Sequence, residues 1–203
     1  DLSIMGMEAA KNISIGYAVK TLFRRSPGRF QPLLRSASQR STQVAAISAV
    51  LARHTRRFSP DTAILAGLLQ DIGVLPVLSF LERHPDTVRS ETEVAGLLKA
   101  LSAKVGSALL SHWQFDENLV EVARSKDDWS RDSGSDPDLA DLVLIAGLHY
   151  YLATSPSGRY PRLDQLPAFG KLSLGDLNAE SRLVVLEQAE HEIREIERML
   201  TDG

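Results

Sequence analysis

The sequence predicts an all-α fold. Apolar residues recur every three or four positions along most of the 203 residues, no stretch alternates with the period of two expected of a strand, and helix start and stop signals separate the apolar segments. Hydrophobic residues make up 43% of the chain and charged residues 24%, which is ordinary for a globular protein with a substantial core. We therefore expect one helical domain over residues 1–203.

The first two helices are predicted from spacing and punctuation. Residues 2–23 carry apolar side chains at helical intervals, and Pro27-Gly28 follows as a turn signal. Residues 31–58 form a second helical pattern with one apolar stripe. His54 lies on this stripe, and we expect it to be a packed core residue rather than a metal ligand.

Capping residues predict where the later helices begin. Ser59-Pro60-Asp61 supplies an N-cap, a proline at the first helical position and an early acid, and this helix is expected to end at Gln70-Asp71. Another helix is expected over Val74 to Arg83. Ser90 with Glu93 forms a plausible capping box for the next.

The second half of the chain is expected to continue the helical pattern. Helices should start near Asp116 and Asp136, and a last helix should carry an exposed Glu190 and Arg194 pair at i,i+4 spacing. Residues 127–136 are polar and rich in turn formers, so we expect a loop there and the most mobile segment of the chain.

The net charge of −3 hides an uneven distribution. Residues 1–60 carry +8 and the remainder −11. Such a basic part can serve an anionic partner. The alternative is that it packs beside the acidic part of the same fold. The candidate anion-binding residues are Arg24, Arg25, Arg53, Arg56 and Arg57.

Composition also bounds the compartment and the chemistry. The chain has no cysteine, which excludes disulfides and thiolate metal sites, and it shows no secretory signal pattern. No uninterrupted apolar run approaches the roughly 18 residues of a membrane span. We expect a cytoplasmic protein with no membrane association and no cofactor.

The most informative segment is Ala66–Leu75, which reads AGLLQDIGVL. It resembles AGLLHDIG, the hallmark of the HD superfamily of metal-dependent phosphohydrolases and of the related HDOD family. In a working HD site the adjacent His and Asp bind a metal that activates water. Here Gln70 stands at the histidine position, and its neutral amide oxygen is a poor metal ligand.

Further matches extend this resemblance to the HDOD family over residues 4–200. Residues 4–23 are similar to a family helix with a central Lys-Asn pair, residues 41–52 to its Ser-x-x-x-Ala helix, residues 105–113 to its Val-Gly-x-x-Leu-Leu-x-x-Trp signature, and residues 142–153 to its late helix. The resemblance implies an HD-domain-like helical bundle. Family members usually begin with more helices, so we expect this chain to lack N-terminal helices of the domain.

The resemblance also implies that the ligand set has been lost. The positions of the family's other metal ligands fall on Arg40, Lys126, Asp127 and Gly147, which leaves Asp71 alone. We therefore expect a vestigial pocket with no catalytic and no metal-binding residue, formed by Arg40, Gln70, Asp71 and Lys126. Arg40 or Lys126 should pair with Asp71 in place of the metal. The alternative is that Asp71 caps nearby backbone.

The resemblance favours a non-catalytic regulatory or scaffold module of bacterial signal transduction that binds other signalling proteins. A metal-dependent phosphohydrolase or phosphodiesterase with an altered site is the alternative, for which His112 and His149 are the histidines to check. A phosphate or nucleotide ligand in the residual pocket is a further hypothesis. Nucleic-acid binding is not favoured, because no aromatic platform interleaves the arginines and no helix-turn-helix pattern is present.

Overall fold

The chain folds into helices, as predicted. The computed structural model describes residues 14–16, 18–19, 21–23, 28–155, 159–178 and 183–202, and in them the only strand-like feature is an isolated antiparallel bridge between Leu177 and Leu183. The α-helices are α2 (Gln31–Thr55), α3 (Pro60–Leu69), α4 (Val74–Arg83), α5 (Glu91–His112), α6 (Glu117–Arg124), α7 (Leu139–Thr154), α8 (Pro167–Leu172), α9 (Val184–Gln188) and α10 (Glu190–Asp202), with short 3-10 turns at Pro85–Thr87 and Leu163–Gln165.

The first predicted helix is only partly described. Residues 14–16, 18–19 and 21–23 are helical, and Val19 and Phe23 are buried. The rest of that prediction lies outside the described residues, as do Arg24 and Arg25.

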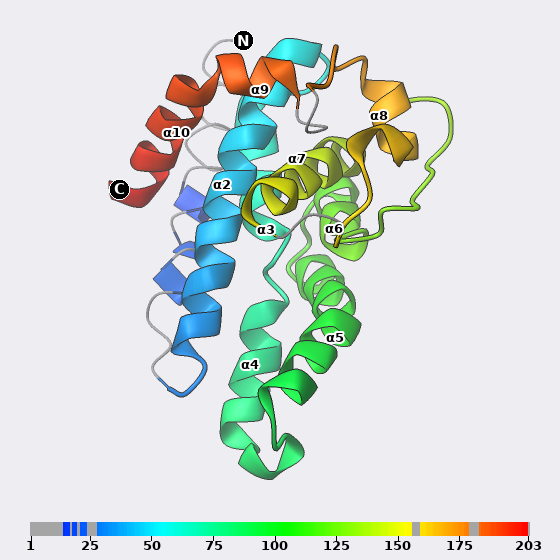
Figure 1. The fold of residues 1–203 in the computed structure, drawn as a ribbon. Helices are drawn as coiled ribbons and strands as arrows, with labels where there is room; N and C mark the ends of the chain where they lie inside the picture. The colour runs from blue at the N-terminus through cyan, green and yellow to red at the C-terminus, as the bar shows by residue number, and fades with distance from the viewer. Residues whose placement is uncertain are drawn as a thin grey trace.

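Helix α2 forms the centre of the core, packed against α3, α7 and α10 (Figure 1). Small residues permit the close approach of α3. A Cβ at Gly67 would lie 2.5 Å from the Cα of Ala45, so these two positions must remain small for the helices to pack as they do. The stripe of α2 is buried through Leu51, but His54 is exposed, so its expected place in the core is wrong. Arg56 adopts a left-handed conformation directly after α2 and turns the chain away.

The predicted break after α3 is a tight turn packed against α5. The N–H of Ile72 donates to the carbonyl of Leu69, and that of Val74 to the carbonyl of Asp71. A Cβ at Gly73 would lie 2.0 Å from the carbonyl oxygen of Ser102 in α5, so only glycine fits there. The turn is therefore fixed in place, together with the Asp71 it carries.

Helices α4 and α5 lie side by side at one end of the molecule (Figure 1). The stretches Pro60–Arg83 and Glu91–His112 are long and apolar enough to cross a membrane by length and composition, which the sequence reading did not anticipate. The first is 78% buried within the fold and is broken by the turn before Val74, whereas the second is 28% buried.

The predicted caps are present in the second half of the chain. Ser90 accepts a hydrogen bond from the N–H of Glu93, Asp116 from that of Asn118, and α7 begins with a capping box between Asp138 and Asp141. The expected last helix is divided into α9 and α10. Its exposed pair is confirmed, because Arg194 donates to Glu190 at 3.0 Å.

Candidate functional site

Three charged side chains from distant parts of the chain meet in the core. Nε of Arg40, on α2, lies 2.6 Å from Oδ2 of Asp71, and Nζ of Lys126, just after α6, lies 3.1 Å from Oδ1. The predicted ion pair is confirmed, and both candidate cations contribute to it. We refer to Arg40, Gln70, Asp71 and Lys126 as the Asp71 cluster.

The three charged side chains are buried, so each needs an opposite charge beside it. The side chain of Asp71 is 0% exposed, that of Lys126 9% and that of Arg40 19%. Burial opposes ionisation of Asp71, but the charges of Lys126 and Arg40 outweigh it and hold the pKa of the carboxyl below its ordinary value. Burial also opposes the charged forms of the two cations, yet Asp71 raises both of their pKa values. All three groups are therefore charged at neutral pH.

Gly147 lies next to Gln70 of the Asp71 cluster. A Cβ at Gly147, on α7, would lie 3.7 Å from Oε1 of Gln70. Both residues line a small chamber of about 10 Å³, together with Lys126, Asp127 and Trp129. This is room for about one water molecule and not for a phosphate or nucleotide. The expected anionic ligand therefore has no space in this conformation.

Aromatic side chains lie beside the Asp71 cluster. The guanidinium of Arg40 is 5.8 Å from the ring centre of Tyr151, which stacks on Tyr160 at 4.6 Å. Trp129 meets both tyrosine rings edge-on, at 6.0 and 6.3 Å. Burial raises the pKa of the Tyr151 phenol, so it stays neutral beside the two cations. These rings limit the access of water to the ion pairs.

The Asp71 cluster does not fit a metal ion. Within the part of the chain that the structure describes, no group of three or more His, Asp or Glu side chains converges as a metal site would require. Asp71 is the only carboxylate of the cluster, and two fixed cations already occupy both of its oxygens. Of the two histidines considered for an altered site, His112 is exposed and His149 is half-buried.

A second buried carboxylate is held in the same manner. Asp141, 0% exposed, lies 2.7 Å from Nη1 of Arg131 and 3.0 Å from Nζ of Lys171. Arg131 also pairs with Asp138 at 2.5 Å and with Glu121 at 3.3 Å. Residues 127–136 are a loop, as predicted. These bonds tie the middle of that loop to α6, α7 and α8, which argues against the mobility expected of it.

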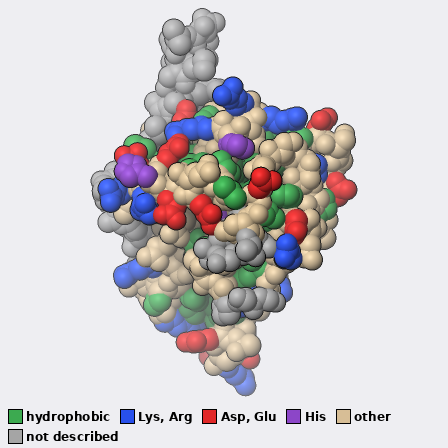
Figure 2. Space-filling view, turned by 45° about the horizontal axis from the view of Figure 1, so that its top comes forward, with side chains coloured by type: hydrophobic (Ala, Val, Ile, Leu, Met, Phe, Trp, Pro, Cys, Tyr) green, Lys and Arg blue, Asp and Glu red, His purple; other side chains and the backbone are tan. Residues whose placement is uncertain are grey.

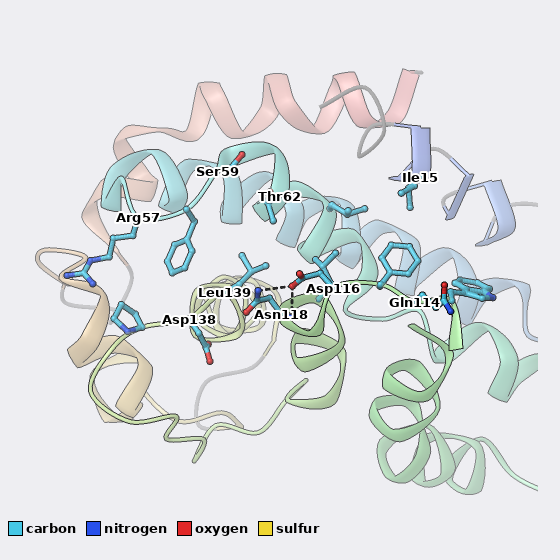
Figure 3. A pocket seen from close by; sticks show the side chains of 15 residues that line it. Ile15, Arg57, Ser59, Thr62, Gln114, Asp116, Asn118, Asp138 and Leu139 are labelled. Carbon is cyan, nitrogen blue, oxygen red and sulfur yellow. Dashed lines mark hydrogen bonds between the residues drawn. The ribbon is translucent and has the colours of Figure 1, made fainter. Parts of the chain in front are cut away.

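A separate groove of about 780 Å³ lies elsewhere on the molecule (Figure 3). It lies between the starts of α3, α6 and α7 and the end of α5, and shares no residue with the Asp71 cluster. Trp113, 45% exposed, is one wall, and Asp116 in the centre accepts hydrogen bonds from Asn118. The full lining is Ile15, Arg57, Phe58, Ser59, Thr62, Leu65, Trp113, Gln114, Phe115, Asp116, Asn118, Leu119, Pro137, Asp138 and Leu139.

The structure describes three of the candidate anion-binding arginines, Arg53, Arg56 and Arg57, and does not gather these three into one pocket. Arg53 forms an ion pair with Glu192 of α10, while Arg56 and Arg57 are exposed and Arg57 lines the groove. Charges of both signs are interspersed on the face shown in Figure 2. The ion pair to α10 supports packing of the basic part against the acidic part of the same fold.

Sequence reasoning missed the residues around the Asp71 cluster. Trp129 gave no signal, because it lies in a polar loop. Asp141 was hidden within an apolar helix, although a carboxylate at a fully apolar face is itself a sign of a buried partner. Its partners Arg131 and Lys171 lie 10 and 30 residues away and could not be paired with it from spacing.

Comparison with known proteins gives one family and two similar structures. The family model of the HDOD domain matches residues 2–129. A crystal structure from Shewanella amazonensis SB2B, provisionally named a metal-dependent phosphohydrolase, superposes with a TM-score of 0.79 at 22% identity, over 95% of this chain and 70% of that one. A crystal structure of an HDOD domain protein of unknown function from Geobacter sulfurreducens superposes with a TM-score of 0.61 at 21% sequence identity, over 90% of this chain and 67% of that one. No curated protein matches significantly.

Proposed function

Because the chain belongs to the HDOD domain family, we propose that it is a non-catalytic regulatory module of bacterial signal transduction, located in the cytoplasm and acting by binding other signalling proteins. The observation that supports this most strongly is the pairing of Asp71 with Arg40 and Lys126. The position expected to hold a metal in an HD enzyme carries internal cations instead.

Electrostatics explains why this arrangement opposes catalysis. A divalent ion would have to displace both cations from Asp71 and then lie beside their uncompensated charges in a buried site. Gln70 and Gly147 offer at most one neutral oxygen between their side chains. Lys126 thus supplies the positive charge that the carboxylate needs, but an ammonium group cannot activate water as an open metal site does.

The proposal is tested by metal content and hydrolysis, measured on the purified wild-type chain and on the Asp71→Ala variant. After incubation with Mn²⁺ and dialysis, we expect less than stoichiometric metal in both proteins and no hydrolysis of bis(p-nitrophenyl) phosphate above buffer. The opposite result would be one bound ion per chain and phosphodiesterase activity, both lost in the Asp71→Ala variant. It would establish the alternative, a phosphohydrolase with an altered site.

The binding role needs its own measurement. The chain, used as bait in an extract of its native cell, should enrich a defined signalling protein over a helical bait of similar charge. Direct titration of that purified partner should then give saturable binding. If no partner binds directly, the scaffold role is wrong even when the chain is catalytically inactive.

A further inference from the structure

The small chamber beside the Asp71 cluster is lined by an unmatched hydrogen-bond donor. Gln70 is 7% exposed, and its Nε2 has no partner among the described residues. It lines the chamber together with Lys126. A buried amide donor left without an acceptor is unfavourable, so the chamber is suited to a ligand that accepts hydrogen bonds.

The segment of residues 127–138 starts at one wall of this chamber. Asp127 and Trp129 are part of that wall, and Trp129 meets the stacked rings of Tyr151 and Tyr160 edge-on. The segment leaves α6 through Asp127, whose φ of 62° is unusual for a residue other than glycine. It returns to the frame at Asp138, the N-cap of α7.

Asp141 fastens the middle of this segment. Its carboxylate binds Arg131 and accepts a hydrogen bond from Ser133 at 3.1 Å, both of which belong to the segment. Lys171 of α8 reaches across to the same carboxylate and lies 3.0 Å from Oγ of Ser133. Arg131, Ser133, Asp141 and Lys171 are not among the residues that line the chamber, so these contacts can be removed without replacing a residue of its wall.

The segment also controls the charge at the chamber. Arg40 and Lys126 are balanced by Asp71 and Asp127 while the segment is closed, because Asp127 lies 2.8 Å from Nζ of Lys126. When the segment lifts away it takes Asp127 with it. One net positive charge then faces the space that Trp129 has left.

We propose that residues 127–138 form a locked strap beside the chamber, and that unlocking the strap creates a site for a small oxyanion on Gln70 and Lys126. A chamber of about 10 Å³ admits no such ion, so the lock at Asp141 decides whether the site exists. This site does not depend on the proposed scaffold role and would be found in a catalytic or a non-catalytic protein.

The first test measures the strap directly. The chain has two tryptophans, so a Trp113→Phe background leaves Trp129 as the only reporter. In this background Lys171→Gln removes one side of the lock. The matched control is Arg162→Gln, which removes the same charge from an exposed pair with Asp164. We expect the acrylamide quenching constant of Trp129 to rise several-fold in the Lys171 variant and to stay unchanged in the control. Equal quenching in both would refute the strap.

The second test measures the site, with inorganic phosphate as the probe and sodium chloride at equal ionic strength as the reference. Phosphate should raise the melting temperature of the Lys171→Gln variant saturably, should leave the wild type and the Arg162 control unaffected, and should lose its effect when Gln70→Leu is added. Removing a lysine weakens non-specific attraction of phosphate, so a gain can come only from the opened site.

A milder unlocking variant guards against misfolding. Ser133→Ala removes one hydrogen bond to Asp141 and leaves every ion pair intact. Circular dichroism identifies which unlocked variants fold. If a folded unlocked variant shows exposed Trp129 but no saturable phosphate effect, or if the effect survives Gln70→Leu, the oxyanion site is wrong.

Discussion

Replacing Asp71 by asparagine isolates the energetic role of the Asp71 cluster. The substitution keeps the shape but leaves Arg40 and Lys126 as buried charges 2.6 and 3.1 Å from a neutral amide. Removing one partner of a buried ion pair costs roughly 3–5 kcal/mol. Because Arg40 keeps 19% exposure and Lys126 keeps Asp127 at 2.8 Å, we expect the lower end, about 3 kcal/mol. In a chain of this size this corresponds to a fall in melting temperature of roughly 6–12 °C.

The assay is urea unfolding followed by circular dichroism at several pH values. The folded-state pKa of Asp71 is lowered, so its contribution is present above the unfolded pKa of about 3.9 and is lost as the pH falls toward the folded value. The difference between wild type and Asp71→Asn should therefore be constant near neutral pH and shrink below about pH 4. The control Asp86→Asn, an exposed carboxylate, should leave the midpoint unchanged.

A triple variant separates pairing from burial. Arg40→Met with Asp71→Leu and Lys126→Met replaces all three charges by apolar groups of similar size, which is often neutral or stabilising in buried ion networks. We expect it to be more stable than Asp71→Asn alone. A loss below about 1 kcal/mol for Asp71→Asn would refute the reasoning, because it would mean that the two cations find water or other acceptors at no cost.

Four further substitutions, two of them controls, test the frame that holds the cluster. Gly73→Ala should destabilise by about 3 kcal/mol or more in urea unfolding, since its Cβ would lie 2.0 Å from the carbonyl of Ser102. Gly96 lies on α5, and a Cβ added there would meet nothing within 4 Å, so Gly96→Ala should stabilise the protein by up to about 1 kcal/mol. Asp138→Ala removes a cap and an anchor of Arg131 and should cost about 2 kcal/mol, against about 1 for the exposed cap Asp116→Ala. Equal losses at the two caps would contradict the role given to Arg131.

Local chemistry explains what could be predicted from the sequence. Ser59 is at the N-cap position of α3, as predicted, although its side chain makes no capping hydrogen bond. The start of α3 follows from Pro60 at the first helical position, and the turn after α3 follows from Gly73. The family pattern then placed Arg40 and Lys126 near Asp71, and the charges of these side chains dictated the pairing. Both steps needed only neighbours in sequence or residue types at known positions.

The errors concern features set by distant contacts. His54 follows the apolar spacing of α2, but the helix ends one residue later and its last turn extends beyond the packed region. The polar composition of residues 127–136 correctly indicated a loop, but it gave no sign that Arg131 finds its acceptors on α6 and α7. Spacing within one segment carries no information about such partners.

The charge asymmetry of the sequence has a structural explanation in these pairs. Arg40 and Arg53 belong to the basic first 60 residues, and both bind carboxylates of the acidic remainder, Asp71 and Glu192. Each ion pair joins segments at least 31 residues apart, so these opposite charges of the two parts of the chain are matched inside the fold. A basic sequence segment therefore need not produce a basic surface, and an anion-binding role for Arg53 would first have to break its contact with Glu192.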